Sequence, residues 1–274
     1  MNILDLNKFQ KKIETFIEDG KSKIHILTDF DKTLTKGRLS KNTSVIAKIR
    51  ESDHVPELMK EGLYKNFNRF HPFENDPDLS NAAKSKYMVE WYKATDQVFM
   101  SHKLSKQMLA DVVEHSDLDF RDDIQDLFAI CKKHKIPIVI ISAGLGDLIQ
   151  LYLEKYNMLS PNVHIVSNFF IYNEQGDVID RTLPVIHPMN KYESLINESK
   201  FFSKIKDRTN VIQMGDHVGD YQMVSGFDYK TLLSIAYLHI DCPKVKQQFM
   251  ENFDIIYEHE ADFTEVINIL KKAK

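Results

Sequence analysis

The sequence has few of the features that mark secreted, membrane-bound or zinc-binding proteins. It contains only two cysteines in 274 residues, and neither belongs to a C-x-x-C pair or to a Cys/His set with zinc-finger spacing. We therefore expect Cys131 and Cys242 to be reduced core thiols of a cytoplasmic protein, with a disulfide between them as the less favoured alternative.

Long apolar runs and an excess of basic charge are missing as well. No apolar run approaches the roughly 18 residues that a membrane span requires. The net charge is −4 and the basic residues are spread along the chain, whereas nucleic-acid-binding domains are usually strongly basic. We expect a monomer that binds neither membranes nor nucleic acid.

The first residues lack the apolar stretch of a secretory signal, because charges occur throughout residues 1–20. The spacing of the apolar residues predicts an amphipathic helix that ends at Gly20. Its apolar face would consist of Ile3, Leu6, Phe9, Ile13 and Phe16.

The remaining pattern is typical of a soluble α/β protein, with 43% hydrophobic and 28% charged residues. Apolar segments that alternate with helical patterns predict a parallel sheet with helices on both faces. The predicted strands are 23–29, 136–144, 163–168, 210–216 and, less clearly, 231–238. Helices are predicted at 120–135 and 145–157, and a hairpin at 169–180.

Residues 41–118 do not follow this alternation. They contain no clear buried strand and several helix-like stretches. We predict a helical cap domain at 41–118, inserted after the first core strand and lying over the carboxyl edge of the sheet. The α/β core would then consist of residues 1–40 and 119–274.

Polar side chains follow three of the predicted strands. The carboxyl ends of parallel strands meet at one edge of a sheet, where ligands bind, so these side chains are expected to surround one point. A lysine that follows the stretch "HPMN" is expected to join them. The residues are Asp29 and Asp31 in "TDFDKTLT", Ser142 in "SAG", Asp216 and Asp220 in "GDHVGD", and Lys191.

These residue types suit phosphoryl transfer with a magnesium ion. Hard oxygen ligands favour Mg²⁺, and Asp29, Asp216 and the backbone carbonyl of Asp31 are the candidates. A carboxylate can also attack phosphorus and form an aspartyl-phosphate. Asp31 is then placed to protonate the leaving oxygen and afterwards to activate water.

The other polar residues would serve the phosphate group and the metal. Ser142 and the backbone N–H groups after it would hold phosphate oxygens, and Lys191 would neutralise phosphoryl charge. Asp220 would order the lysine or the waters of the metal. Taken singly, Ser142 can be a helix N-cap, Lys191 a surface lysine and Asp216 a turn residue. Their combination at strand ends favours a shared site.

The chain resembles a known superfamily at these positions. "DFDKT", the Ser142 turn, Lys191 and "GDHVGD" are similar to the four motifs of the haloacid dehalogenase phosphotransferases, and the helical insertion resembles their type I cap. The stretches "HPFENDP", "ISAGLGD", "NVHIVSN" and "NVIQMGDHVGDYQM" resemble the pyrimidine 5′-nucleotidase family, the cytosolic type III enzymes. This similarity runs from about residue 20 to about residue 265.

The resemblance implies a Rossmann-like core with a helical cap and a role for each matched residue. Asp29 would be the nucleophile and Asp31 the acid/base. Mg²⁺ would lie on Asp29, Asp31 and Asp216, with Asp220 in support. The phosphate- and substrate-binding residues would be Ser142, Ala143 and Lys191, Thr33 of the D-x-D-x-T pattern, and Glu74 and Thr95 near the base.

The base-binding end is less firmly indicated than the catalytic end. Glu74 could instead be a solvated loop residue, and the pattern around Trp91 favours the core of a cap helix over base stacking. His217 departs from the small hydroxyl residue that is frequent at its position in the family, which leaves the base preference open.

The sequence therefore predicts a Mg²⁺-dependent 5′-nucleotidase that releases phosphate from nucleoside 5′-monophosphates, pyrimidine ones (UMP or CMP) in particular. Two alternatives stay open. One is another small-molecule phosphatase of the superfamily, such as a phosphoserine phosphatase. The other is a catalytically silent binding protein on the same scaffold.

Overall fold

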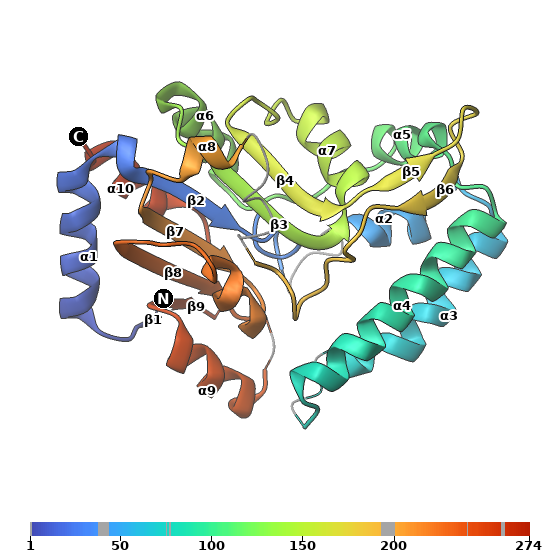
Figure 1. The fold of residues 1–274 in the computed structure, drawn as a ribbon, viewed down its shortest axis with the longest axis horizontal. Coiled ribbons are helices and arrows are strands. Elements are labelled where there is room, and N and C mark those ends of the chain that lie inside the picture. Colours follow the sequence, from blue (N-terminus) through green and yellow to red (C-terminus); the bar gives the residue numbers. More distant parts are fainter. Residues whose placement is uncertain are drawn as a thin grey trace.

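A mostly parallel sheet forms the centre of the protein (Figure 1). The computed structural model describes residues 2–37, 44–74, 76, 78–192, 201–239, 241–258 and 261–274. Within them the strand order is β1-β9-β8-β7-β2-β3-β4, and every neighbouring pair is parallel except β1 and β9. The strands are β1 (Asn2–Ile3), β2 (Ile24–Thr28), β3 (Ile138–Leu145), β4 (Val163–Asn168), β7 (Asn210–Gly215), β8 (Thr231–Tyr237) and β9 (Ile255–Tyr257).

Both faces of the sheet are buried, which explains why its strands are apolar without interruption. In β2, Ile24 and Ile26 belong to the cluster on one face and Leu27 to the cluster on the other. The first face is covered by α1 (Leu6–Asp19), α6 (Ile124–His134), α7 (Gly146–Lys155) and α10 (Thr264–Lys272). The second is covered by α8 (Phe202–Ile205), the 3₁₀ helix η3 (Val218–Val224) and α9 (Pro243–Asn252).

The five predicted core strands are confirmed to within two residues at each end, but the N-terminal helix begins later than expected. It starts at Leu6, capped by Asp5, and ends at Gly20 as predicted. Ile3, which was expected on its apolar face, lies in β1 and pairs with Ile255 of β9. Strand β1, at the edge of the sheet, and its neighbour β9 have two and three residues, which is too short for a periodic pattern to reveal them.

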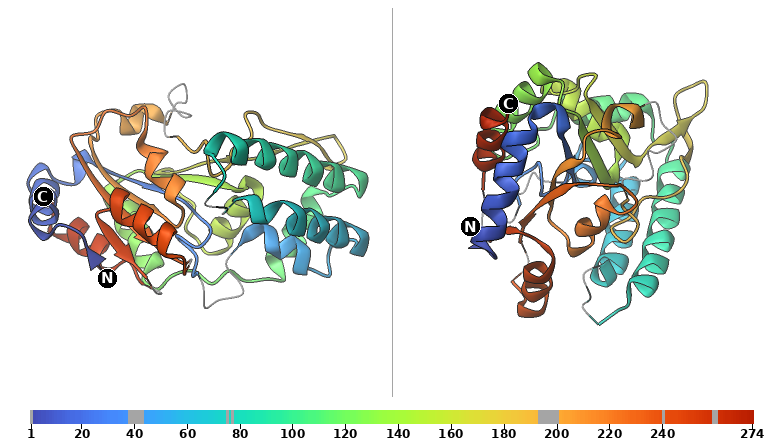
Figure 2. Two further views of the ribbon diagram at one scale, coloured as in Figure 1. Left: turned by 90° about the horizontal axis from the view of Figure 1, so that it is seen from below. Right: turned by 60° about the vertical axis from the view of Figure 1, so that its left-hand side comes forward.

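Helices follow one another between β2 and β3, in the segment predicted to be the cap. They are α2 (Val45–Glu51), α3 (Glu57–Glu74), α4 (Asn81–Ser101) and α5 (Lys106–Glu114). Helices α3 and α4 run side by side and extend away from the sheet, as two views show (Figures 1 and 2). Helices α2 and α5 pack against α7 of the core. The predicted boundary at residue 40 falls outside the described residues, so the division at 41–118 stays a prediction.

The predicted hairpin is formed by β5 (Phe170–Tyr172) and β6 (Val178–Arg181), which pair antiparallel. Its strand β6 packs against α4. The guanidinium of Arg181 forms an ion pair with Asp96 of α4, and the rings of Phe99 and Phe170 meet edge to face at 5.3 Å.

Two expectations drawn from composition can be compared with the structure. Cys131 and Cys242 are both free thiols; Cys131 is buried as expected, whereas Cys242 is only half-buried at the start of α9. Among the described helices, none is both long enough and apolar enough to cross a membrane.

Candidate active site

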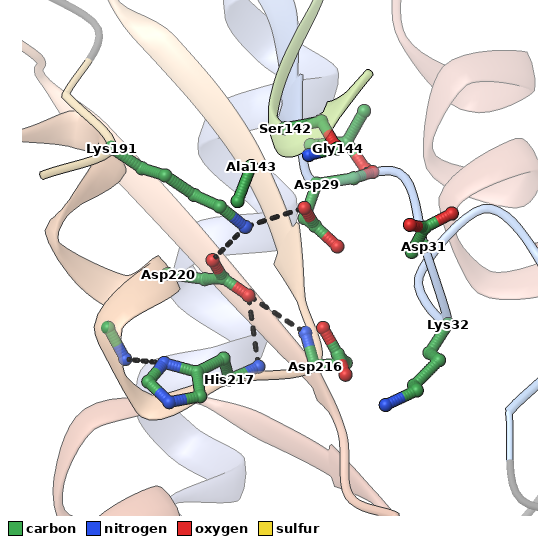
Figure 3. A network of polar contacts seen from close by, with 12 residues as sticks. Asp29, Asp31, Lys32, Ser142, Ala143, Gly144, Lys191, Asp216, His217 and Asp220 are labelled. Atoms are coloured by element: carbon green, nitrogen blue, oxygen red, sulfur yellow. Dashed lines mark hydrogen bonds and ion pairs between the residues drawn. The ribbon is translucent and has the colours of Figure 1, made fainter. Parts of the chain in front are cut away.

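Three strand ends bring the predicted polar residues together at the carboxyl edge of the sheet. Strand β2 lies between β3 and β7, so Asp29 after β2 is flanked by Ser142 in β3 and by Asp216 after β7. The N–H of Asp29 donates to the carbonyl of Met214 at 3.0 Å, which continues the β2–β7 pairing up to the site. Figure 3 shows the carboxylates of Asp29, Asp216 and Asp220 facing a common space.

Lys191 enters this site from a loop after β6 and is almost fully buried. Its ammonium group lies 2.6 Å from Oδ1 of Asp29 and 3.0 Å from Oδ1 of Asp220. The second oxygen of Asp220 accepts the backbone N–H groups of Asp216 at 3.0 Å and of His217 at 2.9 Å. Asp220 therefore holds both the lysine and the turn that carries Asp216.

Three carboxylates share this space with one buried lysine. Asp29, Asp216 and Asp220 each offer an oxygen, and these oxygens all lie within 4.8 Å of one another. Within the described residues, the carboxylate of Asp216 accepts no hydrogen bond. Removal from water raises the pKa of Asp216 well above its usual range, and the neighbouring Asp29 adds to the rise. A divalent cation would relieve this excess of negative charge, and an all-oxygen donor set fits Mg²⁺.

Asp31 has a different environment from Asp29, although only one residue separates them. Its side chain turns toward the start of α2, where Oδ1 accepts the N–H of Val45 at 3.1 Å and Oδ2 the hydroxyl of Ser44 at 3.2 Å. Burial, followed by the charge of Asp29, raises the pKa of Asp31 to about 7. The structure does not bring this side chain into the carboxylate cluster, so the metal contact of its backbone carbonyl stays a prediction.

The turn at the end of β3 is held by side chains from several elements. The hydroxyl of Ser142 accepts the N–H of Gly144 at 3.0 Å, and the carbonyl of Ala143 accepts hydrogen bonds from Tyr92 of α4 and from Asn168. Ser142 is not an N-cap, because α7 begins four residues later, at Gly146, and Leu145 holds the N-cap position.

Thr33 is placed differently from what the D-x-D-x-T pattern suggested. It is fully buried, and it does not line the cavity above the carboxylates. Its carbonyl accepts a hydrogen bond from Arg121 at 2.7 Å, and its hydroxyl has no partner among the described residues. Its position supports a role in shaping the loop rather than direct contact with a substrate.

A cavity of about 630 Å³ lies between the strand ends and helices α2, α3 and α4. Its floor contains the catalytic candidates, including Asp29, Asp31, Ser142, Ala143, Lys191 and Asp216. Its opposite wall is largely aromatic, and Glu74 and Thr95 both line it, but their contact with a base stays a prediction. The side chains of this wall include Phe67, His71, Glu74, Trp91, Tyr92 and Thr95.

Two expectations about this wall need correction. Glu74 is not a loop residue: it is the last residue of α3, and its side chain is only 23% exposed. Trp91 was expected inside a helix core, but it is half-buried and lines the cavity, with its ring 6.0 Å from Phe67 and 6.4 Å from Phe70.

Several cavity residues were not singled out by the sequence. Lys32 follows the second aspartate of the D-x-D-x-T pattern at a position where the pattern specifies no residue type, and Arg50 appears in the sequence as an ordinary basic residue of a helix. In the structure both line the cavity, and the guanidinium of Arg50 lies 4.3 Å from the ring centre of Phe67. No spacing rule connects α2 with α3 across the intervening turn, so the sequence carried no signal for this contact.

Comparison with known proteins settles the family. A sequence model of the pyrimidine 5′-nucleotidase family (UMPH-1) matches residues 31–274. The chain belongs to this family. The 7-methylguanosine phosphate-specific 5′-nucleotidase of Gallus gallus is 29% identical, over 94% of this chain and 91% of that protein. The crystal structure of cytosolic 5′-nucleotidase IIIB bound to cytidine superimposes with a TM-score of 0.88 at 27% identity, over 99% of this chain and 92% of that one.

Membership in the family confirms the predicted superfamily, fold class and enzyme class. This pyrimidine 5′-nucleotidase family member is a phosphoric monoester hydrolase with a haloacid dehalogenase-type core. A probable phosphoserine phosphatase from Vibrio cholerae shares the fold alone, with a TM-score of 0.59 at 18% identity over 94% of this chain and 67% of that one.

Proposed function

We propose that this protein is a Mg²⁺-dependent 5′-nucleotidase that hydrolyses nucleoside 5′-monophosphates, pyrimidine ones in particular, through an aspartyl-phosphate. The observation that carries the proposal is a single cavity with buried carboxylates and Lys191 at one end and an aromatic wall with Glu74 at the other. A phosphate fits the first end and a nucleobase the second.

Asp29, Asp216 and the backbone carbonyl of Asp31 would hold the metal ion, and Asp220 would support it. When bound, Mg²⁺ neutralises charge on the carboxylates and on the phosphoryl oxygens. Asp220 contributes through its hydrogen bonds to Lys191 and to the backbone of Asp216, which fix two groups that the metal and phosphate would contact.

Asp29 would attack the phosphorus atom as a carboxylate. The bond from phosphorus to the 5′-oxygen breaks, and the leaving oxygen takes the proton of Asp31. A water molecule then attacks the phosphorus of the aspartyl-phosphate, Asp31 accepts its proton, and the bond to Asp29 breaks. A pKa of about 7 suits Asp31 to both proton transfers near neutral pH.

Lys191, Ser142 and the backbone around Ala143 would hold the phosphate. Lys191 is already positioned by two ion pairs, so little reorganisation is needed when phosphoryl charge develops. The hydrogen bond that Tyr92 donates to the carbonyl of Ala143 fixes the turn from the cap side.

The aromatic wall and Glu74 would bind the base, with Thr95 beside them. Neutral cytosine has an exocyclic amine that can donate to a carboxylate, and rings such as Trp91 and Phe67 can stack on its face. Cytidine in the similar nucleotidase IIIB structure supports a pyrimidine substrate. We further propose that the protein is a monomer of the cytoplasm that binds neither nucleic acid nor membranes.

A second candidate substrate is 7-methylguanosine 5′-monophosphate, because the Gallus gallus relative is named for it. Its base carries a positive charge, which suits a carboxylate and an aromatic face. The two substrates differ in the charge of the base, which is neutral in cytosine and positive in 7-methylguanine.

The test is phosphate release from a panel of substrates with Mg²⁺ present. The panel comprises cytidine, uridine, adenosine and 7-methylguanosine 5′-monophosphates, phosphoserine and p-nitrophenyl phosphate. We expect the highest kcat/KM for a pyrimidine nucleotide. Preference for phosphoserine would refute nucleotidase activity, and preference for 7-methylguanosine 5′-monophosphate would refute the pyrimidine assignment only.

A further inference from the structure

The backbone of Lys32 is fixed in an unusual conformation beside the catalytic carboxylates. Its φ angle is +61°, a left-handed value that few residues other than glycine adopt. Its N–H donates to the hydroxyl of Thr35 at 2.7 Å. Its carbonyl accepts Nη2 of Arg121 at 2.6 Å and lies 3.0 Å from Nε2 of His239. Such a conformation persists where the surroundings hold it, and here it directs the side chain into the cavity.

Lys32 lines the same cavity as Asp216 at the phosphate end and Glu74 at the base end. Figure 3 shows the ammonium group of Lys32 on the same side of the site as Asp216. The charge of Asp216 is the largest influence that raises the pKa of Lys32, and the next carboxylate in order is Glu74. Burial raises the pKa of Glu74, and Lys32 is the strongest of the cations that oppose this rise, ahead of Lys191 and Lys84.

The wall that would contact the base carries little negative charge. Among the described cavity-lining residues of α2, α3 and α4, Glu74 is the only carboxylate, whereas Arg50 brings a positive charge. His71 lies beside Glu74, with Nε2 4.0 Å from its carboxylate, and burial lowers the pKa of His71 so that the ring is neutral at physiological pH. Lys32 therefore adds a second cation to a cavity whose base-contacting wall carries one anion.

We infer that Lys32 compensates the charge of Glu74 and makes this site select neutral nucleobases over cationic ones such as 7-methylguanine. This inference rests on the proposed nucleotidase function and deepens it. A neutral base can donate to Glu74 whether or not a lysine stands nearby. A cationic base would meet the repulsion of Lys32 and Arg50, and Glu74 alone would have to offset both.

The kinetic test compares two nucleotides in variants of Lys32. We expect Lys32→Met to raise the ratio of kcat/KM for 7-methylguanosine 5′-monophosphate over cytidine 5′-monophosphate by about threefold to tenfold, the range of a partly solvated charge interaction. Both substrates carry the same phosphate, so an effect of Lys32 on the chemical step cancels in the ratio. Lys32→Arg keeps the charge and should keep the wild-type ratio.

Lys103→Met provides the matched control. Lys103 also has a left-handed backbone, with φ +51°, and it does not line the cavity. The variant therefore loses the same side-chain charge from a similar conformation and should leave the ratio unchanged. Lys32→Gln gives the same readout as Lys32→Met should the latter not fold.

A binding measurement separates base recognition from catalysis. Trp91 is the only tryptophan of the chain and lines the cavity, so its fluorescence reports on occupancy of the base end. Cytidine and 7-methylguanosine, which carry no phosphate, are titrated without Mg²⁺, with correction for the nucleosides' own absorbance and emission. We expect Lys32→Met to tighten binding of 7-methylguanosine relative to cytidine.

The outcomes separate this inference from the proposed function. Ratios that do not move in Lys32→Met, in kinetics and in binding, would overturn the role of Lys32 while leaving a nucleotidase in place. A wild-type protein that hydrolyses no nucleotide would overturn the proposed function and the inference together. Equal shifts in Lys32→Met and Lys103→Met would show a general charge effect and overturn the inference alone.

Discussion

Asp29 and Asp31 show how neighbouring groups give two carboxylates of one motif different properties. Asp29 is almost fully buried and paired with Lys191, while Asp31 accepts hydrogen bonds from a helix N-terminus and has a pKa of about 7. Burial raises the pKa of Asp29 as well, but the ion pair with Lys191 opposes this rise and favours the charged form that a nucleophile needs. Among the described residues, Asp31 has no such cation paired with it, and its raised pKa favours a group that exchanges protons.

Asp29→Asn should abolish phosphatase activity while the fold is retained. The amide keeps the shape of the side chain but lacks the attacking charge, and losing an essential nucleophile costs on the order of 10³-fold or more in rate. Steady-state turnover of p-nitrophenyl phosphate measures the loss. Asp122→Asn, at an exposed carboxylate outside the cavity, is the control. A folded Asp29→Asn protein with a tenth of wild-type activity would exclude the aspartyl-phosphate route.

Glu74→Ala should lower kcat/KM for the preferred nucleotide more than for p-nitrophenyl phosphate, which has no base. Loss of a hydrogen bond to a neutral base costs about 0.5–1.5 kcal/mol, or roughly threefold to tenfold in the ratio of the two values. Glu61→Ala, exposed on the same helix, is the matched control. If the ratio stays the same, Glu74 does not contact the base.

At the scale of elements, the hairpin β5–β6 joins the helices of the insertion to the core. The buried guanidinium of Arg181 pairs with Asp96 and lies 5.0 Å from the ring centre of Tyr92, the residue that reaches the Ala143 turn. Arg181, at the end of β6, therefore helps to position α4 of the aromatic wall and, through Tyr92, the backbone at Ala143 in the proposed phosphate site.

Asp96→Ala should destabilise the protein, because it leaves the buried charge of Arg181 without its partner. Removal of one member of a buried pair costs about 3–5 kcal/mol, and the partial exposure of Asp96 reduces this to roughly 2–4 kcal/mol. Thermal unfolding should show a lower Tm. The double variant Asp96→Ala/Arg181→Met should recover part of the loss, since it removes the unpaired charge. A double variant no more stable than Asp96→Ala would show that the pair contributes mainly through packing.

The elements of this protein differ in how well the sequence predicts them. The strands buried on both faces are predictable because a short, uninterrupted apolar run between turn residues is typical of such strands. The polar residues at the ends of these runs predicted most of the carboxylate cluster. The short strands β1 and β9 were missed because two or three residues carry no periodicity. Trp91, Arg50 and Lys32 were misread or missed because their environment depends on how separate helices and loops meet, which one-dimensional spacing does not encode.

At the scale of the whole molecule, the proposed metal site joins parts of the chain that lie far apart in sequence. Asp29 follows β2, and Asp216 and Asp220 follow β7, so a bound ion would bridge the two central strands. A ligand that binds only the folded state stabilises it, by about 2.7 kcal/mol at a hundred times its Kd.

EDTA should abolish activity, and Mg²⁺ should restore it and raise Tm. Ca²⁺ should restore activity poorly, because it prefers more ligands and looser geometry. The Mg²⁺-dependent rise in Tm should disappear in Asp216→Asn, which loses one anionic ligand. Full turnover in chelated buffer, or the same Tm rise in Asp216→Asn, would contradict the proposed ligand set.

The place of β2 between β3 and β7 also has a consequence for synthesis on the ribosome. Asp29 is made early, but its neighbour Asp216 follows only after most of the chain, roughly 10–40 s later at 5–20 residues per second. Until then β2 has an open edge where β7 will pair, and unpaired apolar strands readily associate with other chains. Newly made chains should therefore depend on protection by chaperones for most of their synthesis, and the catalytic cluster can assemble only near its end.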